Sequence, residues 1–187
     1  MKKKIRTIQS DLYRYNGLSG KVGLIKGFIK YEGFRYTYFL RKIQQHKRYS
    51  MCWFIYKVFL RHYRYKYGFQ IPDITQIGNG FYIGHFGNIV INPKTIIGKN
   101  CNVAHGVTIG QANRGKQKGV PIIGNNVWIG TGAVIVGKII IGDNVLIAPN
   151  SYINIDIPSN SLVIGNPCKV IPKENPCEGY IEYECEQ

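Results

Sequence analysis

Aliphatic residues recur at every sixth position through the second half of the chain. A period of six matches neither the 3.6-residue repeat of a helix nor the two-residue repeat of a single strand. It fits short strands joined by tight corners, so that three hexapeptides form one triangular coil around inward-pointing side chains. The inward positions are Ile71, Ile77, Ile83, Ile89, Ile97, Val103, Ile109, Ile123, Ile129, Ile135, Ile141, Ile147 and Ile153. The pattern predicts a mostly β fold, a parallel β-helix over residues 71–172.

Glycine and asparagine gather where this chain has to turn. Gly78, Gly98 and Gly124 each follow an inward isoleucine directly, and asparagines such as Asn100 and Asn126 stand close by. Corners of a narrow prism need left-handed backbone angles or close approaches that a Cβ would obstruct, and asparagine tolerates the left-handed region well. A β-sandwich is the alternative, but its turns recur at about 8–12 residues. The strict spacing disfavours it.

The chain divides into three regions by composition. Residues 1–70 contain few prolines and many Lys, Arg, Leu and Tyr, which predicts an N-terminal α-helical region before the β-helix. Residues 71–172 contain the repeat, and residues 173–187 form an acidic C-terminal tail with five glutamates. The stretch 51–60 is the most apolar in the chain, but it is about half the length that spans a bilayer.

The positive charge of the chain is concentrated in the helical region. The formal net charge is +15, and residues 1–70 carry 17 Lys and Arg against Asp11 and Glu32, interleaved with 17 of the 24 aromatic residues. Two interpretations stay open: peripheral contact with an anionic inner membrane surface, or packing of the aromatics on the first coils with solvated basic side chains. No helix-turn-helix, zinc-finger or RNP-like pattern supports nucleic acid as a partner.

The cysteines and the N-terminus indicate a cytoplasmic protein. The five cysteines show no CxxC spacing and are odd in number, so we expect reduced thiols and neither a disulfide framework nor a zinc site. The basic start is not followed by a long apolar region or a small-residue cleavage site, so a secretory signal is not expected.

Two histidines of the repeat are the first candidates for chemistry. His85 lies two residues after Ile83, and His105 lies two residues after Val103. Because these positions are one full coil apart, we expect both side chains at the same corner on successive coils, about 4.8 Å apart. Asn125 and Asp143 are expected to continue that polar line.

One loop interrupts the repeat. Ile123 lies fourteen positions after Ile109, two more than two hexapeptides, so part of the segment 111–121 must leave the prism. The loop contains Arg114, Lys116 and Lys118, which could close over a phosphate-bearing ligand. A solvated basic loop is the alternative, although loops that interrupt a rigid scaffold often carry function.

Together these segments resemble the left-handed parallel β-helix acyltransferases with hexapeptide repeats. The resemblance covers about residues 65–172 and is closest to the serine O-acetyltransferase branch and its relatives in surface-polysaccharide synthesis. Its most specific pieces are residues 82–87 (YIGHFG), 106–110 (GVTIG), 123–130 (IGNNVWIG) and 163–170 (VIGNPCKV). The resemblance implies left-handed crossovers, a homotrimer with active sites between neighbouring prisms, acetyl-CoA as donor and no metal.

The resemblance also implies roles for individual residues. His85 matches the general base that takes a proton from the acceptor hydroxyl and returns it to the departing thiolate. Asp73 lies near the carboxylate that orients this histidine in the family, although the spacing is three residues shorter, and His105 is a second catalytic candidate. The implied coenzyme contacts are Gly110, Arg114, Lys116, Lys118, Trp128, Gly130, Ala148 and Lys169.

The acceptor is predicted from what the chain lacks. The family loop carries Arg-His-Pro, where this chain has Gly119, Val120 and Pro121, and the Asp before the catalytic His is here Gly84. Because these groups would hold an amino acid, we expect a sugar hydroxyl on a free or lipid-linked saccharide. Serine O-acetylation is the alternative. A zinc carbonic-anhydrase-like β-helix, which needs three histidines, and a non-enzymatic trimeric scaffold are further alternatives.

Overall fold

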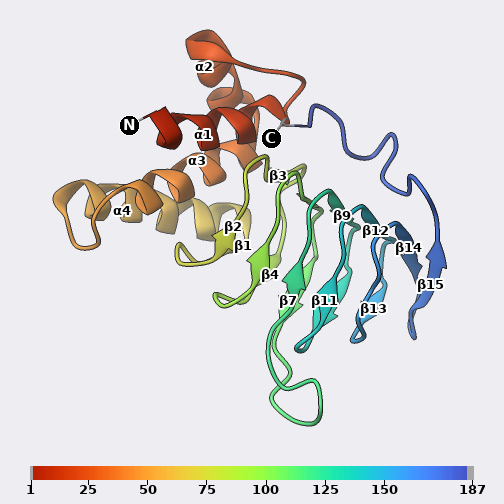
Figure 1. Cartoon of the computed structure of the whole chain (residues 1–187). Helices are drawn as coiled ribbons and strands as arrows, with labels where there is room; N and C mark the ends of the chain where they lie inside the picture. Colours follow the sequence, from red (N-terminus) through yellow and green to blue (C-terminus); the bar gives the residue numbers. More distant parts are fainter. Residues whose placement is uncertain (1, 185–187) are drawn as a thin grey trace.

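Four helices form the N-terminal region of the computed structural model, which describes residues 2–184 (Figure 1). They are α1 (Lys2–Tyr13), α2 (Gly20–Lys30), α3 (Glu32–Gln45) and α4 (Met51–Tyr67). The Ser50 hydroxyl accepts a hydrogen bond from the Trp53 amide at the start of α4, and Gly68 ends that helix with a φ of 77°. These caps satisfy groups that a helix leaves unpaired. The predicted helical region is confirmed.

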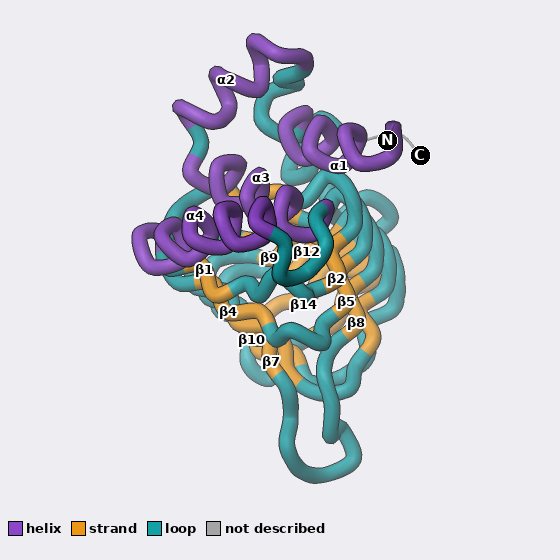
Figure 2. Tube along the Cα trace, turned by 90° about the vertical axis from the view of Figure 1, so that its left-hand side faces the viewer, coloured by secondary structure: helices purple, strands orange, loops and turns teal. Residues whose placement is uncertain are grey.

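Fifteen short strands follow and build a parallel β-solenoid of three sheets (Figure 2). The β1 sheet contains β1 (Phe69–Gln70), β4 (Ile89–Ile91), β7 (Thr108–Gly110), β10 (Val134–Val136) and β13 (Tyr152–Ile153). The β2 sheet contains β2 (Gln76–Ile77), β5 (Ile96–Ile97), β8 (Ile122–Ile123) and β11 (Ile140–Ile141). The β3 sheet contains β3 (Tyr82–Ile83), β6 (Asn102–Val103), β9 (Val127–Ile129), β12 (Val145–Ile147), β14 (Ser161–Ile164) and the antiparallel β15 (Lys169–Pro172).

The six-residue ladder forms the core of this solenoid. The inward residues pair in register from coil to coil, for example Ile83 with Val103 and Val103 with Ile129. Twelve of the thirteen predicted inward side chains are buried, and Ile77 is partly buried against the same core. The mostly β fold class with an N-terminal helical region is confirmed.

The corners are of three kinds, and we name them by their turns. The histidine edge holds the turns after β3, β6, β9 and β12; the loop edge holds those after β1, β4, β7 and β10; the asparagine edge holds those after β2, β5, β8 and β11. At the asparagine edge, Asn100, Asn126 and Asn144 have φ near 54°. The preceding glycines serve close approach instead, because a Cβ on Gly98 would lie 2.4 Å from the Gly124 carbonyl oxygen.

The helical region closes the first coil. Some amides of one coil donate to carbonyls of the following coil, as Gly78 does to Ile97, so the matching carbonyls of the first coil have no preceding coil from which to accept. Side chains of the helices supply the missing donors. Arg41 donates to the Ile77 and Gly78 carbonyls at 2.7 and 2.6 Å, and Tyr36 donates to the Ile71 carbonyl at 2.8 Å.

A buried ion pair holds this junction together. The Arg41 Nε lies 2.8 Å from Asp11 Oδ2, and both side chains are almost fully buried. Asp11 also accepts a hydrogen bond from the Phe81 amide at 2.9 Å. The helices and the first coil therefore share one packed core. No helix within residues 2–184 is both long and apolar enough to cross a membrane.

The C-terminal segment 173–184 runs back along the outside of the β3 sheet toward α1 (Figure 1). The Tyr180 ring packs on Trp128 with 4.8 Å between centroids, and Asn102 donates to the Tyr180 carbonyl at 3.0 Å. Tyr183 reaches Tyr13 of α1 at 6.0 Å between centroids. The described part of the acidic tail is therefore packed on the solenoid, and residues 185–187 lie outside the described residues.

Candidate active site

His85 and His105 lie next to each other on the histidine edge. The pairing of Ile83 with Val103 places the two turns on successive coils. Their ring centroids are 5.9 Å apart with the planes at 87°, and both side chains are exposed. The structure thus brings together the two histidines that the repeat spacing singled out. An exposed imidazole at such an edge can exchange a proton with a bound ligand.

The predicted continuation of this line through Asn125 and Asp143 is wrong. These residues follow the inward isoleucines of β8 and β11, which belong to the β2 sheet, and not those of β9 and β12. They therefore lie on the asparagine edge. There the Asn125 side chain accepts from the Lys99 amide at 2.9 Å, and Asp143 accepts from the Asn125 amide at 2.6 Å. Their role is to connect successive coils.

The histidine edge continues instead as a row of small residues. The register of the β3 sheet aligns the positions directly after its inward residues. These positions are Gly84, Ala104, Gly130 and Ala148. The backbone amides of Ala104, Gly130 and Ala148 all bond to the next coil. Two predicted coenzyme contacts, Gly130 and Ala148, therefore share an edge with His85, and the rings of Tyr82 and Trp128 border the row at Gly84 and Gly130.

The interrupting loop lies on a different edge. Residues 111–120 leave the solenoid after β7 and project beyond it (Figures 1 and 2). Ala112 and Gly119 exchange two backbone hydrogen bonds of 3.0 Å, which closes the base of the loop. Arg114, Lys116 and Lys118 are exposed, and the loop contains no acidic residue. Within one chain, this cationic loop and the two histidines stand at separate edges of the prism.

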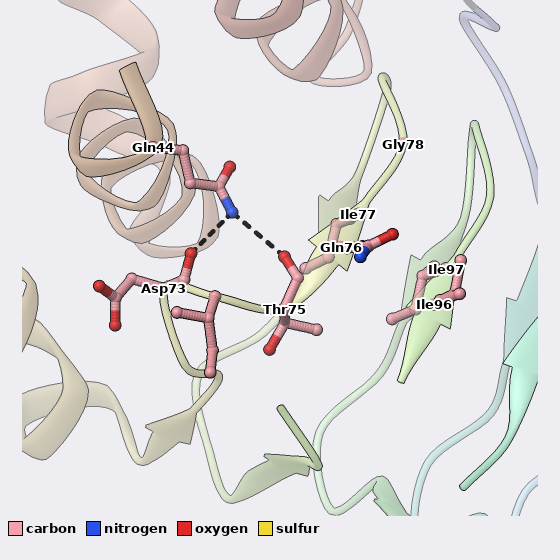
Figure 3. Close-up of a pocket in the computed structure, with 9 residues that line it drawn as sticks. Gln44, Asp73, Thr75, Gln76, Ile77, Gly78, Ile96 and Ile97 are labelled. Atoms are coloured by element: carbon pink, nitrogen blue, oxygen red, sulfur yellow. Dashed lines mark hydrogen bonds between the residues drawn. The ribbon is translucent and has the colours of Figure 1, made fainter. Parts of the chain in front are cut away.

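Asp73 also lies on the loop edge, in the turn between β1 and β2. Its carboxylate contacts Lys57 of α4 at 2.5 Å. Its backbone carbonyl and that of Thr75 accept from the Gln44 amide at 3.0 and 3.1 Å, and the carboxylate points away from Thr75 (Figure 3). Within one chain, Asp73 is therefore engaged with α4, and it does not share an edge with His85.

The remaining predicted coenzyme contacts are dispersed. Gly110 ends β7 at the loop edge, and Lys169 is exposed at the start of β15. Trp128 faces outward from β9, where the Tyr180 ring covers it. Sequence reasoning missed this cover, and the only signal for it was apolar residues such as Cys177 and Ile181 between the glutamates of the tail. Among residues 2–184, no three or more His, Cys, Asp or Glu side chains cluster as a metal site would require.

Comparisons with known proteins place this architecture among acetyltransferases. The family model described as bacterial transferase hexapeptide (six repeats) matches residues 121–154. The serine acetyltransferase of Helicobacter pylori (strain ATCC 700392 / 26695) is 36% identical over 129 residues, which are 69% of this chain and 74% of the relative. The chain is thus similar to this relative over most of both lengths.

Solved structures show the same fold. Soybean serine acetyltransferase, as the apoenzyme, superposes with a TM-score of 0.75 at 22% identity, over 91% of this chain and 70% of the other. The serine acetyltransferase of Brucella abortus strain S19, solved in complex with coenzyme A, gives a TM-score of 0.71 at 21% identity, over 92% and 68%. Both similarities include the helical region as well as the solenoid.

Proposed function

Because this chain belongs to the serine acetyltransferase family, we propose that it transfers the acetyl group of acetyl-CoA to the hydroxyl of serine. The observation that carries the proposal is the extent of the match to the Helicobacter pylori enzyme, combined with an exposed histidine pair on the solenoid edge. Membership in the family makes the chain an acetyl-CoA-dependent O-acetyltransferase.

The predicted sugar acceptor in surface-polysaccharide synthesis is wrong. The matching relatives are serine acetyltransferases, which supports serine, the alternative acceptor. The prediction relied on the absence of Arg and His before Pro121 and of Asp before His85, but missing side chains do not exclude an acceptor that other groups can hold. The loop still offers Arg114, Lys116 and Lys118 as cations for a carboxylate or a phosphate.

His85 is the proposed general base. In this mechanism its imidazole accepts the proton of the serine hydroxyl as that oxygen attacks the thioester carbonyl. The tetrahedral intermediate then collapses, the carbon–sulfur bond breaks, and the imidazolium returns the proton to the thiolate. Imidazole suits both steps because it gains and loses a proton near neutral pH. His105, whose ring is 5.9 Å away, is proposed as a second catalytic group at the same edge.

The donor is proposed to lie along the row of small residues that begins beside His85. Gly130 and Ala148 would contact the pantetheine arm by close approach of the backbone, because their amides already bond to the next coil and their small side chains admit an extended chain. Gly110 would contact the coenzyme through its backbone, and the cations Arg114, Lys116, Lys118 and Lys169 would contact the phosphates. Trp128 was also a predicted contact, but the Tyr180 ring packs on it. The C-terminal tail therefore restricts the access of the coenzyme to this side chain.

A homotrimer would unite the separated parts of this site. The histidine edge of one protomer and the loop edge of its neighbour would face the same cleft, which brings His85 beside a loop and an Asp73 from another chain. A column of outward isoleucines on the β2 sheet supports such an assembly. Ile96, Ile122 and Ile140 pair in register and are each at least 40% exposed. Burial against a neighbour would remove this apolar surface from water.

The test is acetyl transfer by the purified full-length chain. We expect serine-dependent release of coenzyme A from acetyl-CoA, and we expect His85→Ala to lower kcat at least about 100-fold, the usual contribution of a general base. His62→Ala is the matched control, since His62 is an exposed histidine on α4. Failure of the wild-type chain to acetylate serine would overturn the acceptor, whereas unchanged turnover by His85→Ala would overturn only the role of His85.

A further inference from the structure

Helices α2 and α4 each present a second apolar stripe to solvent. On α4 the stripe consists of Met51, Phe54, Ile55 and Val58, which are 76%, 50%, 49% and 68% exposed. On α2 it consists of Val22, Ile25 and Ile29, which are 66%, 59% and 70% exposed. The spacing of three and four residues places each set on one side of its helix. We call these two stripes the α2–α4 face.

The fold of the chain does not account for this face. Helix α4 already buries Leu60 and Tyr67 on its opposite side, and α2 places Gly23 and Gly27 inward. A surface helix normally carries a single apolar stripe toward the core. Exposed apolar stripes of this kind mark sites of interaction with another molecule or a membrane.

Aromatic contacts connect the two helices through α3. The Phe39 ring of α3 lies 5.7 Å from Phe28 of α2 and 5.1 Å from Phe59 of α4, centroid to centroid. The same α3 carries Arg35, whose guanidinium donates to the Phe28 carbonyl at 2.6 Å. Helices α2 and α4 therefore flank α3 as parts of one packed unit (Figure 1).

Basic side chains border both stripes. Lys21, Lys26 and Lys30 are exposed on α2, and Arg61 and Lys66 are exposed on either side of the α4 stripe. The acidic residues of the first 70 positions cannot offset them, because Asp11 is buried against Arg41 and Glu32 is the only other one. The acidic tail is engaged elsewhere, since Glu184 accepts from the Asn126 side chain at 2.8 Å.

We propose that the α2–α4 face docks peripherally on a bilayer that carries anionic lipid headgroups. Apolar side chains ringed by Lys and Arg are the arrangement that lies in the headgroup layer, with the stripe toward the acyl chains and the cations at the phosphates. A second copy of the same face would bring like charges together, which disfavours it as the occupant. This inference goes beyond acetyl transfer and does not depend on it.

The experiment is sedimentation of the full-length protein with vesicles of phosphatidylcholine alone or mixed with phosphatidylglycerol. We expect binding to the anionic vesicles that weakens in high salt, and little binding to the neutral ones. Phe54→Ser with Val58→Ser should reduce binding at least about tenfold, because two large apolar groups no longer insert. Lys21→Glu with Lys26→Glu should reduce it at least about 30-fold, because two cations at the anionic surface are replaced by carboxylates that the surface repels.

The matched controls lie on the solenoid. Ile164→Ser with Ile171→Ser removes comparably exposed apolar groups, and Lys94→Glu with Lys138→Glu reverses exposed charges, so neither pair should alter vesicle binding. Equal binding to both kinds of vesicle would overturn the requirement for anionic lipid. Absence of binding, with an assembly in sedimentation velocity that Phe54→Ser and Val58→Ser dissociate, would overturn the proposal and assign the face to a second copy.

Discussion

The solenoid and the helical region achieve stability in opposite ways. In the solenoid the buried apolar side chains are mostly aliphatic, most strands contribute one to three buried residues, and the backbone pairs from coil to coil. The helical region buries rings such as Tyr36 and Phe34 together with the charged pair of Asp11 and Arg41. The difference teaches that a repeat specifies its own interior but not its end, where the unpaired carbonyls need donors from another kind of structure.

The largest effect is expected from removal of the buried Asp11 carboxylate, which tests whether the helical region stabilises the solenoid. Asp11→Ala leaves the Arg41 guanidinium buried without its partner, and loss of one partner of such a pair costs about 3–5 kcal/mol. We expect helical and β signals to be lost together, at a lower denaturant midpoint, because helices and first coil share a core. Lys57→Ala, which breaks the partly exposed pair with Asp73, should cost at most about 1 kcal/mol. Loss of the helices alone would show that they do not stabilise the solenoid.

The next largest loss of stability is expected from substitution of an inward aliphatic residue of the solenoid. Ile135 is fully buried in β10, so Ile135→Ala should lower the free energy of unfolding by about 2–5 kcal/mol through lost burial and a residual cavity. Ile171→Ala, at a position that is 45% exposed on β15, should change it by no more than about 0.5 kcal/mol. Chemical denaturation of both variants measures the difference. Equal destabilisation would contradict the assignment of inward positions.

The smallest effect is a difference in thiol chemistry between the two regions. Burial raises the pKa of the Cys101 thiol in the solenoid to about 12, so its thiolate is roughly 10³-fold scarcer at neutral pH than that of an ordinary cysteine. Cys52 on α4 is exposed. A maleimide reagent should therefore label Cys52 in the native protein and Cys101 only after unfolding, as peptide mass spectrometry would show. Rapid native labelling of Cys101 would contradict its burial.

The sequence left two interpretations of the basic, aromatic N-terminal region open: contact with a membrane surface, or packing on the first coils. The structure shows which of its side chains pack and which stay exposed. Packing explains Tyr36, Phe39 and the other rings that face the first coil. It leaves the stripes of α2 and α4 exposed, which no count of basic and aromatic residues could show. The positive charge could be counted in the sequence. Which side of α2 and of α4 remains exposed depends on how these helices pack against α3.

The same contrast holds at the candidate active site. The spacing from Ile83 to Val103 predicted that His85 and His105 would be neighbours, because a repeat converts distance along the chain directly into position on an edge. It failed for Asn125 and Asp143, since an interrupted repeat does not state which sheet resumes after the loop. The ion pair of Asp73 with Lys57 joins the solenoid to helix α4, and the repeat pattern could not predict it because Lys57 lies outside the repeat.

By itself the sequence determined the solenoid, its inward ladder, the helical region and the two adjacent histidines. Each of these follows from local spacing and composition, which act within one coil or one helix. Only the tertiary structure decided how the helices close the first coil, that the acidic tail covers Trp128, and that the cationic loop stands on a different edge from His85. These features depend on contacts between segments far apart in the chain, whose geometry is fixed when the packed core forms.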